Sequence, residues 1–338
     1  MLFGLNFSVF GLLLQLCLPG PTPLQGFQLH GYAQGTTYSI TYYAADSSVR
    51  NQEVARQLAE IDASLSLYQP GSLINQFNQA RRGVRTDQHL QRVVGKALQV
   101  YQTTDGTFDA TVEPLVQAWG FGSHAAPAAA PTPATIRTIL TTVGSDKISL
   151  RGDSLLKKVP GVHLDLNGIA QGYTVDVLAA LLERHGIWDY LVELGGELRV
   201  RGHKWPTGEQ MRIGIERPDA DAYAAPTLQQ VIELKEGGVT TSGNYRKFRQ
   251  VGGQQTSHLI NPKTGYPFHN ELISVTVVAA DAMTADAYDN AIMGMGLTKA
   301  LEFLRQNSDL QAYIIYQKPA GAVADTATQG FQQLLSYP

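Results

Sequence analysis

The chain has 338 residues, of which 43% are hydrophobic and 16% are charged, and this apolar content can fill one large buried core or two modest ones. Its 26 basic and 29 acidic residues give a formal net charge of −3, so no global positive field attracts nucleic acid. The sequence contains no nucleic-acid-binding motif, which argues against nucleic acid as a partner, and its single cysteine, Cys17, excludes an intramolecular disulfide.

The first segment of the chain is apolar. Residues 2–18 resemble the hydrophobic region of an export signal, and the helix breaker Pro19-Gly20-Pro21 follows them. No lysine or arginine precedes this region, and Leu16 stands before Cys17 where a bacterial lipoprotein signal has a small residue. We expect an exported, periplasmic protein that is free, anchored in the inner membrane or lipidated on Cys17; a misassigned start codon or a cytoplasmic tail is the alternative. The expected division is a tail over 1–26 and one domain over 27–338.

Hydrophobic periodicity predicts the secondary structure in chain order. We expect strands over 27–43, 163–166, 190–202 with a break at Gly195-Gly196, 211–216, 231–234 and 239–242 on either side of Gly237-Gly238, 245–251, 273–280 and 312–316. We expect helices over 48–64, at the end of 67–78, over 89–103, from Ile169 onward, over 283–293 and over 297–306. The Ala/Pro-rich stretch 125–133 is expected to be a solvated loop. Because the strands form antiparallel-looking clusters, we predict an α+β fold rather than a doubly wound sheet.

Residues 163–176 form the central motif of the sequence. A short apolar strand carries one carboxylate, Asp165, and is followed by a glycine turn at Gly168 and a long helix. Free backbone N–H groups and the positive end of the helix dipole suit phosphate at such a junction. The carboxylate beside the turn favours a metal–phosphate site, because Mg²⁺ prefers hard oxygen ligands; an ordinary strand-to-helix connection is the alternative.

Two further places in the sequence can carry chemistry. Asp286 and Asn290 are four residues apart on an expected helix and therefore share one face, where their oxygens could hold a hard cation; a solvated helix face is the alternative. His258 precedes a Pro/Gly turn, and an imidazole suits a general base, although a plain surface or core histidine fits the same pattern. The remaining histidines lack zinc-ligand spacing, and P-loop and nucleophile-elbow motifs are absent.

The order of the motifs along the chain resembles the ApbE family, the flavin transferases that attach FMN to proteins. This resemblance extends from about residue 29 to residue 306 and implies an ApbE-like fold with an FAD and Mg²⁺ site in a central cleft. The matching segments are Gly35-Thr36-Thr37-Tyr38, Ser66-Leu67-Tyr68, Phe77-Asn78, Gly106-Thr107-Phe108-Asp109, Pro114-Leu115, Trp119-Gly120-Phe121-Gly122, 165–173 with Asp176, Gly195-Gly196, Ile215-Glu216-Arg217-Pro218, Thr241-Ser242-Gly243-Asn244-Tyr245, 258–265 and Ala285-Asp286-Ala287.

The resemblance implies a defined reaction. FAD binds with Mg²⁺ on its pyrophosphate, a Thr or Ser hydroxyl of a target flavoprotein attacks the FMN-side phosphorus, and AMP leaves; such catalysis rests on positioning and charge neutralisation. His258 matches the general base, while the Gly168 carbonyl, Asp286 and Asn290 match the metal ligands. The implied FAD contacts are Tyr68, Thr107, Phe108, Asp109, Asp165, Gln171 and Thr241. The implied target is a subunit of a membrane redox pump or an exported electron-transfer flavoprotein.

The chain departs from the family pattern at four positions. Asn290 stands where a Thr is frequent beside the metal, Gln171 where a Lys is frequent, Gln34 where a Met is usual and Asn261 where an Asp is common. None of these changes removes the base or the acidic metal ligand, so we expect an active FMN transferase. The alternatives are an FAD diphosphatase, in which water replaces the protein hydroxyl and FMN and AMP are released, and a non-catalytic FAD-binding protein.

Overall fold

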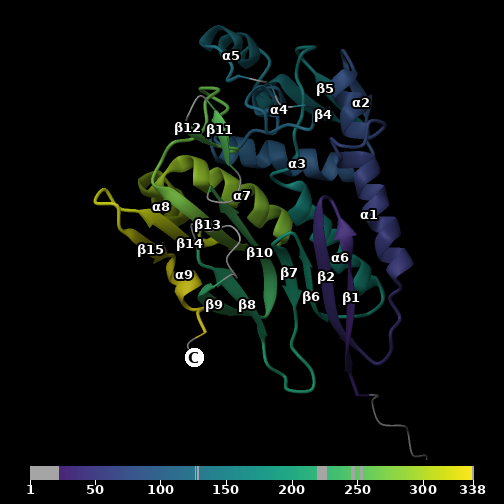
Figure 1. The fold of residues 1–338 in the computed structure, drawn as a ribbon. Helices are drawn as coiled ribbons and strands as arrows, with labels where there is room; N and C mark the ends of the chain where they lie inside the picture. Colours follow the sequence, from purple (N-terminus) through teal and green to yellow (C-terminus); the bar gives the residue numbers. More distant parts are fainter. Residues whose placement is uncertain are drawn as a thin grey trace, which may run out of the picture.

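The computed structural model describes residues 23–125, 127, 129–218, 227–244, 248–251 and 254–336, without the side chains of 248–251 and 254–256. An eight-stranded sheet, antiparallel throughout, forms its centre (Figure 1). In spatial order the strands are β1 (Gln25–Ala33), β2 (Thr36–Ala44), β6 (Asp189–Leu194), β7 (Glu197–Arg201), β10 (Glu236–Gly243), β13 (Leu272–Ala279), β14 (Gln311–Gln317) and β15 (Val323–Ala327). The predicted α+β class with mainly antiparallel sheets is confirmed.

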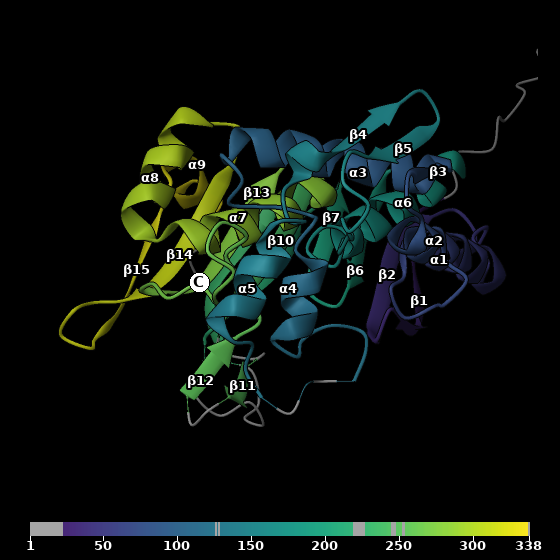
Figure 2. The same cartoon turned by 90° about the horizontal axis from the view of Figure 1, so that it is seen from above.

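Helices cover one face of this sheet in two layers (Figures 1 and 2). The inner layer is α6 (Ala170–Arg184) and α7 (Ala282–Met295), which pack on each other and on β6, β7, β10 and β13. The outer layer contains α1 (Asn51–Leu65), which contacts α6, and α3 (Gln88–Thr103), which contacts α7. Around α3 lie α2 (Leu73–Gln79), α8 (Leu297–Gln306) and a small sheet of β3 (Gly83–Arg85), β5 (Ser154–Lys157) and β4 (Ile148–Arg151).

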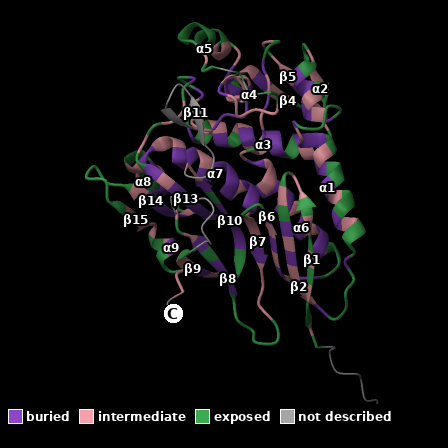
Figure 3. Ribbon diagram, in the orientation of Figure 1, coloured by how far each residue is buried: buried purple, intermediate pink, exposed green. Residues whose placement is uncertain are grey.

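The other face of the central strands is also covered. A hairpin of β8 (Met211–Glu216) and β9 (Leu228–Leu234) lies there together with α9 (Gln329–Gln332). Consecutive residues of β13 divide between the two faces, since Val277 packs toward the α7 side and Val278 toward the hairpin side. A strand that is buried on both faces needs a continuous apolar run, which accounts for the β-branched sequence of β13 and for its burial in Figure 3.

Four shorter elements complete the part of the fold that surrounds the site. They are α4 (Glu113–Ala118), α5 (Pro133–Leu140), the hairpin of β11 (Phe248–Val251) with β12 (Gln254–Ser257), and a single 3₁₀ turn, Ser145–Lys147. In Figure 2, α4 and α5 lie near the β11–β12 hairpin. None of the helices within the described ranges is both long and apolar enough to cross a membrane.

Most of the predicted elements are confirmed, with boundaries that differ by a few residues. The predicted break at Gly195-Gly196 separates β6 from β7. The Ala/Pro-rich stretch 125–133 is irregular where it is described up to Thr132, and its last residue, Pro133, begins α5. Residues 248–251 of the predicted strand 245–251 form β11, while 245–247 lie outside the described residues, as does the predicted export signal up to residue 22. The first strand starts at Gln25, two residues before the predicted domain boundary.

Two predictions about secondary structure are wrong. Residues 163–166 do not form a strand, because the Asn78 side chain takes the place of a neighbouring strand: its amide accepts from Leu164 N at 2.7 Å and donates to Leu164 O at 3.0 Å. The two strands predicted on either side of Gly237-Gly238 are instead separated at Lys235, and Gly237-Gly238 lie inside β10. A Cβ at Gly238 would be 2.2 Å from Ala282 N, so glycine there allows the start of α7 to pack on the strand.

Candidate functional site

The three predicted metal ligands come together at the contact between α6 and α7. Gly168 lies in the turn before α6, and Asp286 and Asn290 lie one turn apart on α7. The Asn290 amide nitrogen is 3.4 Å from the Gly168 carbonyl oxygen and 3.4 Å from Asp286 Oδ1. The other Asp286 oxygen accepts a hydrogen bond from Gly172 N at 2.9 Å. The sequence predicts free backbone N–H groups at this junction, but the N–H of Gly172, in the first turn of α6, orients the carboxylate.

The donor atoms of this cluster fit a hard cation. The amide oxygen of Asn290 accepts from the Ser242 hydroxyl at 3.3 Å, and a half-turn of the amide would exchange its oxygen and nitrogen. The cluster would then present three oxygens, from Gly168, Asp286 and Asn290, while Ser242 could accept from the amide nitrogen because a hydroxyl both donates and accepts. Oxygen ligands of this kind are what Mg²⁺ binds, with substrate phosphates and water as its other ligands.

A further acidic side chain, Asp289, is buried beside the cluster. Asp289 is 2% exposed, and its Oδ1 accepts from the Asn290 amide at 2.9 Å. Burial and then the neighbouring Asp286 carboxylate raise the pKa of Asp289 well above its usual range. Within the described ranges, no three His, Cys, Asp or Glu side chains form a metal site by themselves; the candidate set depends on one backbone carbonyl and one amide.

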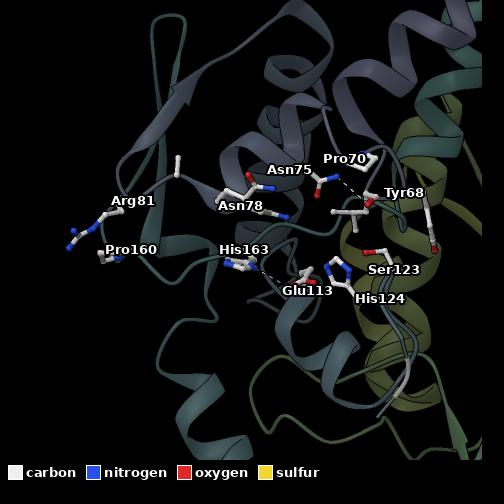
Figure 4. A pocket seen from close by; sticks show the side chains of 13 residues that line it. Tyr68, Pro70, Asn75, Asn78, Arg81, Glu113, Ser123, His124, Pro160 and His163 are labelled. Atoms are coloured by element: carbon white, nitrogen blue, oxygen red, sulfur yellow. Dashed lines mark hydrogen bonds and ion pairs between the residues drawn. The ribbon is translucent and has the colours of Figure 1, made fainter.

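A pocket of about 570 Å³ lies beside the segment that leads to Gly168 (Figure 4), and this volume is typical of small-molecule sites. Tyr68 and Asn75 border it on one side, and Glu113, His124 and His163 on the other. The imidazole of His163 is 3.2 Å from Glu113 Oε2. Sequence analysis did not predict these residues other than Tyr68 as site residues, because their proximity depends on the folding of loops far apart in the chain.

Asp165 lies near both the pocket and the candidate metal ligands Gly168, Asp286 and Asn290. Burial, and then the Glu113 carboxylate, raise the pKa of Asp165 to about 6, although the Asn167 N–H, at 2.8 Å, opposes the shift. Partial burial and then the Asp165 carboxylate raise the pKa of Tyr68. Asp165 is therefore close to two residues that line the pocket and three residues from Gly168.

Other predicted contacts lie around the same turn. The Phe108 ring is 3.7 Å from a Cβ placed on Gly168, and the amide of Gln171 is 3.1 Å from one placed on Gly195. Thr107 approaches α7, with its methyl 2.9 Å from a Cβ placed on Gly294. The structure thus places Phe108 and Gln171 near the metal cluster, and Thr107 beside the helix that carries it.

Asp109 and Thr241 have hydrogen-bonding partners within the protein. Asp109 is 6% exposed, and its carboxylate accepts from the backbone N–H and the hydroxyl of both Thr111 and Ser145, at 2.6–3.1 Å. These four bonds favour a structural role for Asp109, which fixes the segment before α4. The Thr241 hydroxyl is 2.9 Å from that of Thr276 on the adjacent strand. Their predicted FAD contacts stay predictions.

His258, the predicted base, directly follows β12. Its ring meets the Phe121 ring edge-on, with centroids 6.3 Å apart. The loop after it is held by a hydrogen bond from Trp119 Nε1 to Gly265 O at 2.8 Å and by one from Phe268 N to Leu259 O at 2.9 Å. The imidazole is therefore placed by the 119–122 segment, which also leads into the pocket wall at Ser123.

Comparison with solved structures gives the class of protein that this fold and site define, the flavin transferases. The flavin transferase ApbE from Vibrio cholerae superposes with a TM-score of 0.82 and 32% identity, covering 93% of this chain and all of that one. The apo form of the flavinyl transferase ApbE from Pseudomonas stutzeri gives a TM-score of 0.83 at 31% identity, covering 94% of this chain and 99% of that one.

The sequence comparisons identify the family. The model of the ApbE family matches residues 34–314, and the chain belongs to this family. A protein of Vibrio cholerae named FAD:protein FMN transferase is 34% identical over 320 residues, which are 93% of this chain and 94% of that one. A protein of Haemophilus influenzae with the same name is 34% identical over 312 residues, 89% of each chain. The family resemblance found in the sequence is confirmed.

Proposed function

We propose that the chain is a Mg²⁺-dependent FAD:protein FMN transferase that moves FMN from FAD to a Thr or Ser hydroxyl of a target flavoprotein and releases AMP. One observation carries the proposal: the Gly168 carbonyl, Asp286 and Asn290 converge at the α6–α7 contact. The turn that carries Gly168 follows the segment that lines the pocket at His163. Its relatives of similar length carry the name of this activity.

The transfer step exchanges one phosphorus–oxygen bond for another. The acceptor oxygen bonds to the FMN-side phosphorus, the bond from that phosphorus to the bridging oxygen breaks, and the bridging oxygen leaves as part of AMP. The proton of the acceptor hydroxyl goes to the imidazole of His258, which packing against Phe121 holds in place. Mg²⁺ bound by Gly168, Asp286 and Asn290 would supply charge neutralisation at the pyrophosphate.

The remaining residues bind and orient the substrate. The exposed ring of Tyr68 offers a flat apolar surface for a flavin or adenine ring. Asp165, ionised above its pKa of about 6, can accept hydrogen bonds from ribose hydroxyls or an exocyclic amine. The Gly172 N–H holds the Asp286 carboxylate in one orientation. This candidate metal ligand is therefore already ordered before FAD binds.

The decisive experiment follows two products at once. Purified protein is incubated with FAD and Mg²⁺, with and without a Thr-bearing acceptor domain, and AMP release and covalent in-gel flavin fluorescence are measured. A fluorescent acceptor together with AMP, both abolished by a chelator, supports the transferase. AMP without labelling points to the FAD diphosphatase, and bound FAD without either product points to the FAD-binding protein.

Two matched pairs of variants test the residue roles. His258→Ala should nearly abolish transfer while FAD binding persists, whereas His30→Ala, which removes an exposed histidine, should leave transfer unchanged. Asp286→Asn should raise the Mg²⁺ concentration needed for half-maximal transfer steeply, whereas the exposed Asp309→Asn should not. Undiminished transfer by His258→Ala would remove this residue from the role of base, and an unchanged Mg²⁺ titration would remove Asp286 from the ligand set.

The compartment and the acceptor belong to the same proposal. The apolar segment 2–18 supports export, with or without an anchor at Cys17, and an exported transferase would act on acceptor subunits in the periplasm. The acceptor would be a redox-pump subunit or an electron-transfer flavoprotein that displays a Thr or Ser. Mass spectrometry of covalently bound FMN in cells with and without this protein would identify it.

A further inference from the structure

Exposed aromatic side chains lie at the two ends of the eight-stranded sheet. At one end, Tyr32 is 73% exposed beside the β1–β2 turn, and the nearby Gly195 turn leads to Gln171 and the metal cluster. At the other end, two of the three tryptophans of the chain are exposed: Trp188 by 50% and Trp205 by 43%. The third, Trp119, is 9% exposed.

The strand register places the start of β1 at the same end as these two tryptophans. Gln25 pairs with Ala44, and the neighbouring Tyr43 pairs with Asp189, the residue after Trp188. Tyr190 pairs in turn with Arg201 at the end of β7, and the chain then leads to Trp205 in the long loop at the bottom of Figure 1. We call Trp188, Trp205 and the start of β1 the tryptophan end.

The two indole rings are held in place although they are exposed. Trp205 Nε1 donates to Asp189 Oδ2 at 3.0 Å, and His203 N donates to Asp189 Oδ1 at 2.8 Å. The guanidinium of Arg201 lies 4.4 Å from the centre of the Trp188 ring. Trp188 thus lies next to a cation and Trp205 next to a carboxylate. Amphipathic tryptophan rings are side chains that proteins place at the level of lipid head groups.

The sequence supports a lipid surface as the partner of the tryptophan end. Residues 2–18 are apolar, and six residues separate them from Gln25; six extended residues span about 20 Å. An anchor formed by this segment, or by a lipid on Cys17, would keep the tryptophan end within that distance of a bilayer. The opposite end of the sheet, with the Gly195 turn, is roughly 20 Å farther away, because six strand residues separate Gly195 from Asp189.

We propose that the tryptophan end rests on the membrane surface, with Trp188 and Trp205 at head-group level and the pocket and metal cluster facing away from the lipid. This inference rests on the proposed export and anchoring and not on the proposed transferase activity. The orientation leaves the pocket open toward an acceptor subunit while the anchor confines the enzyme to the membrane in which a redox pump resides.

The test uses fluorescence of the full chain bound to vesicles of phosphatidylcholine and phosphatidylglycerol whose acyl chains are brominated near the head group. We expect bromine to remove roughly half of the emission of the unsubstituted protein, because two of its three tryptophans face the lipid. The Trp188→Phe/Trp205→Phe double variant, which retains only Trp119, should lose almost none. Equal loss in the two proteins, or failure of the full chain to sediment with the vesicles, overturns the proposal.

A relocated tryptophan tests the orientation itself. Tyr32→Trp in the double-variant background puts an exposed indole at the opposite end, where bromine should leave its emission unchanged; strong quenching there overturns the orientation. Quenching of the unsubstituted protein by iodide is a test that needs no variant. Vesicles should lower the iodide quenching constant about twofold. An unchanged constant contradicts the proposal. AMP release in the same samples reports the transferase separately.

Discussion

At the scale of single residues, Asn290 is the departure from the family pattern with the clearest structural account. Its amide is within 3.4 Å of both the Gly168 carbonyl and Asp286, and it has the Ser242 hydroxyl behind it. A Thr at this place would offer one oxygen, whereas an Asn offers the cluster a donor in the observed orientation and an oxygen after a half-turn. The substitution therefore retains an oxygen ligand and adds a second orientation that needs no metal.

This account predicts how Asn290 variants bind Mg²⁺. Asn290→Ala should weaken binding about tenfold, the lower end of the usual cost of disturbing a metal site, because one oxygen ligand is lost. Asn290→Thr should bind close to the unsubstituted protein. Calorimetric titration of Mg²⁺ in the presence of FAD measures both, with Asn307→Ala, directly after α8, as the control. Equal affinity in Asn290→Ala and the unsubstituted protein would show that the side chain does not reach the ion.

Asp165 gives a prediction about stability and pH. Its pKa in the fold is raised to about 6 from an ordinary 3.8, so between these two pH values the folded chain binds a proton that the unfolded chain has lost. The contribution of Asp165 to the free energy of unfolding therefore falls as pH rises through this window. Asp165→Asn, which stays neutral, should be about 1 kcal/mol more stable than the unsubstituted protein at pH 7 and no more stable at pH 4.

Urea unfolding at the two pH values measures this difference. The same variant should bind FAD more weakly at pH 7, because the amide replaces an anionic acceptor beside the pocket. A stability gain accompanied by weaker binding is the pattern expected of a residue kept for its ligand rather than for the fold. A gain of the same size at pH 4 would rule out ionisation as its cause.

At the scale of elements, the site depends on how closely α6 and α7 approach. Gly172 lies at this contact, where an added Cβ would be 2.4 Å from Ala282 O and 2.7 Å from Asp286 Cβ. No side chain fits there without moving the helices apart. The glycine thus sets the separation between the turn that carries Gly168 and the helix that carries the other two candidate ligands.

Gly172→Ala should therefore destabilise the protein by about 3 kcal/mol, since overpacking against backbone cannot relax by rotation of a side chain, and should weaken Mg²⁺ binding as well. Gly95→Ala is the matched control. Gly95 is also helical, but its nearest neighbour would be a Leu150 methyl at 3.8 Å, so alanine should stabilise by up to about 1 kcal/mol. Thermal unfolding compares the two, and a neutral Gly172→Ala would mean that α6 and α7 can separate freely.

At the scale of the whole molecule, periodicity predicted the strands and helices whose burial pattern is local. Alternation revealed β2, and the β-branched run revealed β13. The same periodicity wrongly predicted a strand at residues 163–166. The backbone there is hydrogen-bonded to the Asn78 side chain, 86 residues from Leu164 in the sequence. Long-range pairing of this kind leaves no periodic signal.

The candidate site also has a part that local spacing predicted and a part that depends on tertiary packing. Four-residue spacing predicted that Asp286 and Asn290 share a helix face, but only the resemblance to a family joined them to Gly168. The Glu113–His163 contact in the pocket has no motif, since a loop brings the two together. Local spacing thus finds ligands that lie on one element, and tertiary packing decides which elements meet.

The cluster and the pocket belong to one folded body, so ligand binding should be visible as global stability. Ligands at 100 times their dissociation constant stabilise a native protein by about 2.7 kcal/mol, which for a chain of this length raises Tm by about 4 °C. We expect FAD with Mg²⁺ to produce a shift of this size, and a chelator to reduce it. The Mg²⁺-dependent part should vanish in Asp286→Asn and persist in Asp309→Asn. A shift that Asp286→Asn retains in full would place the cation elsewhere in the molecule.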